Sequence, residues 1–385
     1  MANHSKIAII TSVHNALDGR IFQKEARALA AQGYQISLIA PNSLGSTQTI
    51  ESAGMIFEGL ESNTKRSARP IRWRQVAKLL WINRKKYVIW HIHDPELLLI
   101  CVPCRLLFAR NVKIVYDVHE DYSAAVRSKS WLPFYIRGLV SRITLVLEQI
   151  LSKFCSLIIG ATPQISANFT SSPNQQIITI HNYPIVSDEK GSSPSLLPTT
   201  NDHIRCVYAG GISSIRGVKE IIDAFSLLSS HPVELLIAGP SDPVDFIDTH
   251  LEHRPKNISY LGVLSWEEVP ELLGTCDIGL LCFLPEPNHL NSLPTKLFEY
   301  LNAGLAIVAS DFDYWETIIL KEQVGVLVDP TKPASIAHGV LSLIENQSLR
   351  ENLRARGPNL VKNKYSWESQ AHILCAAYDR LTESG

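Results

Sequence analysis

The sequence predicts an α/β protein made of two Rossmann-like domains with parallel sheets. The chain has 385 residues, which is long for one hydrophobic core and sufficient for two. Two stretches, one from Lys6 and one from Ile204, open alike, with an apolar strand-length run, a polar loop and a helical pattern. A stretch rich in Ser, Pro and Thr, residues 187–203, lies between them and has the composition of a linker.

These signals set the expected domain boundaries. Residues 1–186 are predicted to form the first domain and residues 204–362 the second, joined by the linker 187–203. Residues 363–385 are predicted to form a C-terminal helix.

The first domain opens with a strand over 6–13, a loop over 14–20 and a helix that stops at Gly33. The loop lies at the carboxyl edge of the sheet, where ligands bind in such folds. No Gly-x-Gly-x-x-Gly dinucleotide fingerprint is present. Asp18 and Arg20 are either site residues or a helix-capping salt bridge.

A basic segment follows at residues 65–86, with nine cations and no acid among them. Trp73, Val76, Ala77, Leu80 and Trp81 recur in it at helical spacing. This pattern favours a helix on an anionic membrane surface. The alternative is a core helix with a solvated basic face. The nine cations are Lys65, Arg66, Arg69, Arg72, Arg74, Lys78, Arg84, Lys85 and Lys86.

Two further stretches of the first domain have competing interpretations. His91 and His93 share one face of a predicted strand, but no third ligand of suitable spacing follows, so no metal is predicted. Residues 131–155 form a long apolar helical run that charged residues interrupt too often for a transmembrane span. Its apolar face either packs in the domain or dips into a bilayer.

The second domain opens with a strand over 204–209 and a Gly210-Gly211 turn. Glycines allow backbone N–H groups to approach a phosphate closely, and Arg216 stands beside the start of the next helix. The segment therefore predicts a phosphate site.

The stretch 288–311 completes this site as a polar loop, a short helix, a glycine stop at Gly304 and a buried strand over 306–309. Pro294 and Lys296 stand at the helix N-terminus, where free N–H groups and a cation favour an anion. Glu299, one turn further, suits the donor hydroxyls of a ribose. Diphosphate and ribose together predict a nucleotide.

The composition of the chain indicates which partners and which cellular location to expect. The formal net charge of −1 gives no overall attraction to nucleic acid, and none is predicted as a partner. Seven cysteines without regular spacing suggest reduced thiols in the cytoplasm. No signal peptide and no apolar run long enough to span a bilayer are apparent. We expect a cytoplasmic protein, peripheral on the inner face of the plasma membrane.

Glu299 and the Ala303–Ile307 segment around Gly304 resemble the nucleotide-sugar signature of glycosyltransferase family 4, retaining enzymes of the GT-B fold. The likeness covers almost the whole chain and is strongest in its second half. It implies two domains facing across a cleft, with the acceptor on the first domain, the donor on the second, and the last helix crossing back to the first. Three positions depart from the usual pattern: Asn291 stands for a glutamate, Gly211 for an arginine, and Arg216 for a lysine.

The resemblance also assigns roles. His119, after a predicted strand over 112–116, is the implied catalytic residue facing the donor sugar, the alternative being a capping or packing histidine. Leu264 follows a strand after which the family binds the nucleobase. No metal ligand and no cofactor are implied, and Asp311 and Asp313 are rejected as a metal site. The donor-binding residues so predicted are Gly210, Gly211, Arg216, Leu264, Asn291, Pro294, Lys296 and Glu299.

The expected activity is transfer of a hexosyl or N-acetylhexosaminyl group from a nucleotide diphosphate sugar, without a metal. The expected partners are this donor, a glycan or lipid-linked acceptor in surface polysaccharide biosynthesis, and an anionic membrane surface. Two alternatives remain: a nucleotide-sugar 2-epimerase of the same fold, and an inactive glycosyltransferase-like partner subunit.

Overall fold

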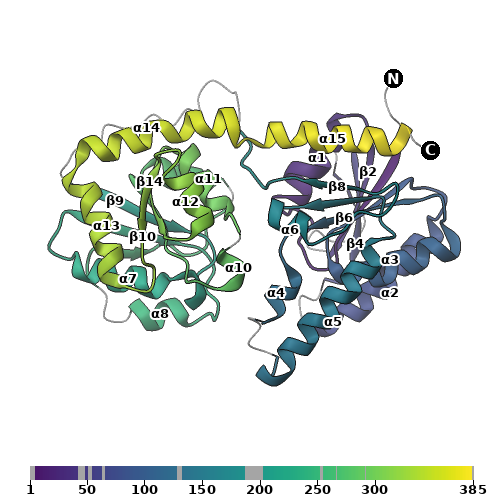
Figure 1. Cartoon of the computed structure of the whole chain (residues 1–385), viewed down its shortest axis with the longest axis horizontal. Helices are drawn as coiled ribbons and strands as arrows, with labels where there is room; N and C mark the ends of the chain where they lie inside the picture. Colours follow the sequence, from purple (N-terminus) through teal and green to yellow (C-terminus); the bar gives the residue numbers. More distant parts are fainter. Residues whose placement is uncertain are drawn as a thin grey trace. The chain divides into compact units, whose positions relative to one another are not determined.

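In a computed structural model the chain divides into two units, each built on its own sheet. The first comprises Met1–Asn182 and Trp367–Gly385, and the second comprises Tyr183–Ser366. Figure 1 shows the helices that cover each sheet. The structure describes residues 5–41, 48–50, 54–62, 66–127, 132–186, 203–251, 255–265, 267–290 and 292–383.

The first unit contains an eight-stranded sheet in the order β3-β4-β2-β1-β5-β6-β7-β8. All neighbouring strands pair in parallel except β3 with β4. The strand order reverses between β1 and β5, and ligands bind beyond the carboxyl ends of strands at such a switch point. The strands are β1 (Lys6–Ile10), β2 (Gln35–Pro41), β3 (Gln48–Ile50), β4 (Met55–Leu60), β5 (Ile89–Ile92), β6 (Lys113–Val118), β7 (Leu157–Gly160) and β8 (Gln176–Thr179).

Helices cover both faces of this sheet and form two hydrophobic cores. One core includes side chains of η1, α1 and α15, and the other includes side chains of α2, α3 and α6. The helical elements are η1 (Ile21–Ala26), α1 (Arg27–Ala31), η3 (Arg66–Ala68), α2 (Arg69–Ile82), α3 (Pro95–Phe108), α4 (Tyr122–Arg127), α5 (Phe134–Ser152), α6 (Pro163–Ala167) and α15 (Trp367–Glu383).

The second unit contains a six-stranded parallel sheet in the order β11-β10-β9-β12-β13-β14. This is the Rossmann order, with its switch point between β9 and β12. The strands are β9 (Ile204–Ala209), β10 (Val233–Ala238), β11 (Ile258–Tyr260), β12 (Ile278–Leu281), β13 (Ala306–Ser310) and β14 (Gly325–Val328). The helical elements are η4 (Ser214–Arg216), α7 (Val218–Leu227), α8 (Phe246–Leu251), α9 (Glu268–Gly274), α10 (Pro287–Leu290), α11 (Thr295–Asn302), α12 (Asp313–Ile319), α13 (Pro333–Glu345) and α14 (Gln347–Lys364).

The unit boundaries differ slightly from those predicted. The first unit breaks at Asn182 rather than at residue 186, because Tyr183 packs edge-on against Phe298 and Tyr365 of the second unit. The last helix begins at Trp367 rather than at residue 363, because α14 continues to Lys364. Residues 187–202 of the predicted linker lie outside the described residues.

The basic segment forms α2, but its apolar stripe points inward. Val76 and Leu80 are completely buried in the core of the first unit, while Trp81 is 52% exposed. Arg72 is buried as well and donates a hydrogen bond to the Ser12 carbonyl. The expectation that this stripe faces a membrane is therefore wrong for Val76 and Leu80, because these side chains fill the layer between α2 and the sheet. Lys65 lies outside the described residues.

Within the described part of the chain, no helix combines the length and the hydrophobicity needed to cross a membrane.

Candidate active site

The carboxyl edge of the second sheet gathers the glycine turn and the two predicted cations. Gly210 follows β9 with φ 131°, a backbone conformation that favours glycine. A Cβ at Gly210 would lie 2.1 Å from Cε of Lys296. Glycine at this position therefore leaves the space that the Lys296 side chain fills.

Lys296 is buried at the start of α11 against two aromatic rings. Its Nζ donates a hydrogen bond to the Tyr208 hydroxyl at 3.0 Å and lies 4.2 Å from the centroid of that ring. The Phe283 centroid lies 5.5 Å from the same Nζ and 5.6 Å from the guanidinium carbon of Arg216. The structure thus brings Arg216 and Lys296 to one ring, beside Gly211, whose carbonyl accepts a hydrogen bond from Tyr208 at 2.6 Å.

The electrostatics of this pair favour an anion. Burial lowers the pKa of Lys296 well below its ordinary value, and the charge of Arg216 lowers it further. Glu299 acts in the opposite direction. A bound anion would raise the pKa of Lys296 again, because a nearby negative charge stabilises the ammonium form.

The loop before α11 is held in place by Trp315, whose Nε1 donates to the Ser292 carbonyl at 2.6 Å. Pro294 is the half-buried N-cap of α11, and Glu299 is half-buried one turn further along the helix. Gly304, with φ 72°, ends the helix as predicted. Asn291 lies outside the described residues.

Among the predicted donor-binding residues, Leu264 has the weakest structural link to the others. It follows β11 at the same sheet edge and is half-buried. A hydrogen bond from the Gly239 amide to the Gly262 carbonyl, at 2.7 Å, joins its loop to the loop after β10. The described contacts do not join Leu264 to the Lys296–Arg216 pair.

His119 follows β6, the strand next to β5 and so one strand away from the switch point of the first sheet, and it retains 17% side-chain exposure. Its Nε2 lies 3.1 Å from Nδ1 of His93 and 3.4 Å from Oδ2 of Asp117. The ring of His14, from the loop after β1, lies 5.2 Å away. Burial opposes the charged form of His14, but its hydrogen bond to Asp18 and the charges of Asp94 and Asp18 outweigh burial and raise its pKa.

Asp18 and Arg20 separate into two roles. Oδ1 of Asp18 accepts hydrogen bonds from the backbone N–H groups of Arg20 and Ile21, so Asp18 caps η1. The Arg20 side chain is buried, with Nε 2.8 Å from Oε1 of Glu25 and two hydrogen bonds to Asp117. Arg20 therefore belongs to a buried charge network beneath His119.

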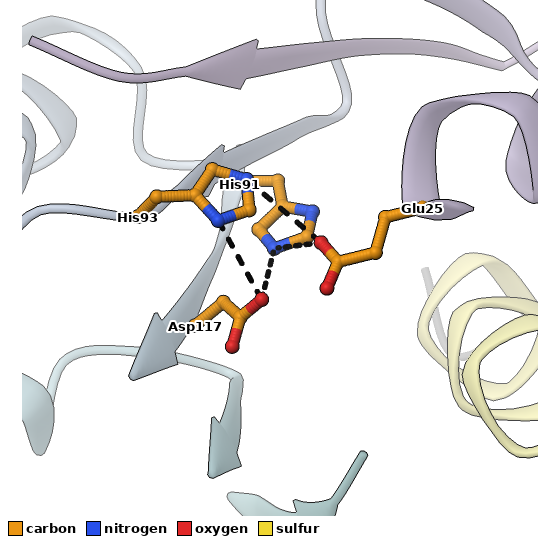
Figure 2. A group of neighbouring side chains, drawn as sticks. All are labelled: Glu25, His91, His93 and Asp117. Carbon is orange, nitrogen blue, oxygen red and sulfur yellow. Dashed lines mark ion pairs between the residues drawn. The ribbon is translucent and has the colours of Figure 1, made fainter. Parts of the chain in front are cut away.

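This network includes four residues that could hold a metal ion: Glu25, His91, His93 and Asp117. Figure 2 shows their side chains turned toward one another, with one ligand atom from each lying within 4.8 Å of the others. All four are buried. The sequence offered no third ligand for the histidine pair, because Glu25 and Asp117 come from distant elements, η1 and β6.

The charges of the network balance when Glu25 holds a proton. Two carboxylates, Glu25 and Asp117, face one guanidinium, Arg20. Burial opposes ionisation of Asp117, but Arg20 outweighs it and holds the pKa of Asp117 well below its ordinary value. Burial and the charge of Asp117 raise the pKa of Glu25. A proton on Glu25 leaves the three groups neutral, whereas a divalent cation would leave buried positive charge.

Sequence reasoning missed several residues of these two sites. Tyr208 and Phe283 hold the two cations, and Asp94 fixes the loop after β1 by accepting hydrogen bonds from Thr11 and Ser12. Each of them stands at or just beyond the carboxyl end of a strand. That position, which marks ligand sites in parallel sheets, is the signal that could have found them.

Two family models match the chain. Glycosyltransferase Family 4 matches residues 19–183, and Glycosyl transferases group 1 matches residues 197–360. A phosphatidyl-myo-inositol mannosyltransferase of Mycobacterium leprae is 33% identical over 175 residues, which are 45% of this chain and 43% of that protein. The chain spans about half the length of the curated relatives it matches.

Solved structures share the fold along almost the whole chain. Sucrose-phosphate synthase from Thermosynechococcus elongatus matches with a TM-score of 0.77 and 15% identity, over 99% of this chain and 100% of that one. HepE from Anabaena, in complex with UDP and glucose, matches with a TM-score of 0.72 and 14% identity, over 98% and 100%. With a family model on each half and this fold, the chain belongs to glycosyltransferase family 4 and has the GT-B fold.

Proposed function

We propose that the protein is a retaining glycosyltransferase that moves a hexosyl or N-acetylhexosaminyl group from a nucleotide diphosphate sugar to an acceptor. The observation that carries this proposal is the convergence of Lys296 and Arg216 on Phe283, at the switch point of a Rossmann-ordered sheet. Two cations beside a glycine turn suit a diphosphate. The solved structure of HepE holds UDP and glucose, which supports this class of donor.

The other donor contacts follow from the same edge of the sheet. Glu299 accepts hydrogen bonds from the ribose hydroxyls, and Leu264 lies against the base. Pro294 sets the start of α11, so that its N-terminus and Lys296 point at the same phosphate.

The chemistry needs a stabilised leaving group. The bond between the anomeric carbon and the diphosphate oxygen breaks while the acceptor oxygen bonds to that carbon on the same face. The leaving phosphate takes the acceptor proton. Lys296 and Arg216 stabilise the negative charge that develops on the diphosphate. His119 serves as the catalytic residue of the first unit, with Asp117 fixing its ring from behind.

This chemistry does not require a metal ion, since the charge on the diphosphate is met by side-chain cations. Lys296 and Arg216 supply the positive charge that a divalent cation supplies in metal-dependent phosphate sites. Asp311 and Asp313, which the sequence rejects as a metal site, are both exposed.

We place the acceptor on a membrane, as a lipid-linked glycan of surface polysaccharide synthesis at the inner face of the plasma membrane. The mycobacterial relative is named for mannosyl transfer to phosphatidyl-myo-inositol, which is a lipid. The cations of α2 add attraction to an anionic leaflet, since Arg74 and Lys78 are exposed and α2 contains no acid.

A panel of nucleotide sugars incubated with the protein tests the activity. Slow release of free sugar and nucleoside diphosphate from one donor supports a transferase. Appearance of a new nucleotide sugar would instead indicate an epimerase, and no turnover of any donor would indicate an inactive partner subunit. The Lys296→Met variant should abolish the release, whereas Lys332→Met, at a 73% exposed position of the same unit, should not.

A further inference from the structure

The helix α5 exposes many of its apolar side chains and buries polar ones. Its buried residues are Ser141, Glu148 and Ser152, which are all polar. The outward side is apolar, with Phe134 85% exposed, Tyr135 84% and Leu139 62%. A surface helix of a water-soluble domain normally has the opposite arrangement. The exposed apolar side chains that recur along α5 are Phe134, Tyr135, Leu139, Ile143, Val146, Leu147 and Ile150.

Hydrogen bonds on the inward side fix this orientation. The Tyr116 hydroxyl donates to Oε1 of Glu148 at 2.6 Å. Oγ of Ser141 donates to the Ser123 carbonyl at 2.7 Å and accepts from Nε of Arg127 at 3.2 Å. Rotating α5 to bury its apolar side would break these bonds and leave buried polar groups unpaired, which costs about 1–3 kcal/mol for each group. The apolar side therefore stays outward.

The neighbouring helix α3 also exposes apolar side chains. α3 packs between α2 and α5 (Figure 1), and Leu99, Leu106 and Leu107 are exposed on it. Clusters of large exposed apolar side chains mark interaction sites rather than ordinary solvent-facing surface.

The charges around this surface select its partner. The only acid in α5 is the buried Glu148, while Arg142 in the helix and Lys153 just after it are exposed. Exposed Arg74 and Lys78 of α2 carry the same sign. A second copy of the chain would set these cations against their equivalents, whereas an anionic lipid surface complements them.

We propose that α5 lies in the interfacial plane of an anionic bilayer, with its apolar side among the acyl chains and its cations at the headgroups. The inference rests on the proposed function, in which the acceptor is membrane-borne, and it moves the principal membrane contact from α2 to α5. Nineteen residues of helix extend about 28 Å along the surface, which is enough for an interfacial anchor without a spanning segment.

Co-sedimentation with vesicles of phosphatidylcholine, alone or mixed with phosphatidylglycerol, tests the proposal. Wild-type protein should pellet with the mixed vesicles and remain largely in the supernatant with phosphatidylcholine alone. The triple variant Leu139→Gln, Ile143→Gln and Ile150→Gln should bind at least tenfold more weakly. Its melting temperature should not fall, because all three side chains are exposed. The matched control changes three exposed apolar residues of the second unit, Leu227→Gln, Val244→Gln and Val263→Gln, and should bind like wild type.

Two results would overturn the inference. One is wild-type protein that ignores the mixed vesicles, or a triple variant that still binds them fully. The other is a wild-type dimer, detected by light scattering, that the triple variant dissociates without any vesicle binding, since this would assign the surface to a second copy. Donor hydrolysis, measured without vesicles, distinguishes the failure of one proposal from the failure of the other. If the wild type hydrolyses no donor, the proposed glycosyltransferase activity is refuted. If it hydrolyses a donor but does not bind vesicles, only the membrane contact of α5 is refuted.

Discussion

The Lys296 ammonium donates a hydrogen bond to the Tyr208 hydroxyl at 3.0 Å and lies 4.2 Å from the centroid of the same ring. Tyr208 lies near the carboxyl end of β9, on one side of the switch point of the second sheet. Lys296 lies on α11, which comes after β12 on the other side. An aromatic face and a neutral hydroxyl stabilise a buried cation only partly. The lysine therefore gains most of its stabilisation when an anion binds.

The first prediction concerns this anion. Replacing Lys296 by Met should weaken binding of a nucleoside diphosphate about tenfold or more, because a charge-assisted hydrogen bond contributes about 1.5–3 kcal/mol. The free nucleoside should bind almost as before. Titration calorimetry with both ligands measures the difference. Arg216→Met should show the same pattern, and equal losses for the nucleoside and the diphosphate would refute the assignment of either cation.

The second prediction is that diphosphate binding takes up protons. Burial, aided by Arg216, lowers the pKa of Lys296 in the free protein, and a bound anion raises it. Part of the Lys296 population then changes from neutral to charged on binding, so proton uptake should grow as the pH rises through the free-state pKa. Calorimetry in buffers of different ionisation enthalpy measures the uptake. Lys296→Met should remove it, and an uptake that survives this change would belong to another group.

The third prediction concerns Glu299. If its carboxylate accepts hydrogen bonds from ribose hydroxyls, Glu299→Gln should weaken ribonucleotide binding and leave 2′,3′-dideoxy analogues unaffected. A purely structural role in α11 would instead lower the melting temperature without changing this preference. Measuring both quantities on one preparation decides between the two roles.

The sequence was sufficient to predict that Arg216 and Lys296 come together, because their loops lie at strand ends. Gly210, Arg216, Lys296 and Glu299 all stand in or beside loops at the carboxyl edge, and a parallel sheet aligns these loops. Chain order therefore implied that Arg216 and Lys296 would meet. Their shared partner Phe283 was not evident, since an aromatic residue after a strand is equally common in a core.

Side-chain direction could not be predicted in the same way. Glu25 lies four residues after Ile21 and four before Leu29, so the helical pattern places it on the apolar face but does not indicate that it meets Asp117. The apolar pattern of α5 likewise revealed a wide hydrophobic face but not which way that face points. Its orientation depends on Tyr116 and Ser123, which lie in other elements.

The fourth prediction concerns the buried network. Because Glu25 is expected to keep a proton, Glu25→Gln should change the free energy of unfolding little. Arg20→Met leaves Asp117 without its partner and should cost about 3–5 kcal/mol, as for other broken buried ion pairs. Urea denaturation measures both variants.

The same network predicts the response to chelators. Prolonged dialysis against EDTA should leave the melting temperature of the wild type and its donor hydrolysis unchanged. A stoichiometric metal in the purified protein, lost together with stability on dialysis, would contradict the proton assignment and make Glu25, His91, His93 and Asp117 the ligands.

The last prediction is a pH dependence of stability carried by Glu148. Burial raises the pKa of this carboxyl from 4.5 to about 7, and the hydrogen bond from Tyr116 offsets burial only in part. The native state thus holds a proton that the unfolded chain releases above about pH 4.5, so the free energy of unfolding should fall as the pH rises from there to about 7. The fall should amount to about 3 kcal/mol and then level off. His93, whose pKa burial lowers to about 4, acts in the opposite direction over much of this range.

Comparison with Glu148→Gln isolates the effect, because glutamine stays neutral and still accepts the Tyr116 hydrogen bond. The variant should match wild type near pH 4.5 and exceed it above pH 7, whereas Glu271→Gln, at an exposed position of α9, should follow wild type throughout. Parallel curves for wild type and Glu148→Gln would show that Glu148 is ionised in the folded protein.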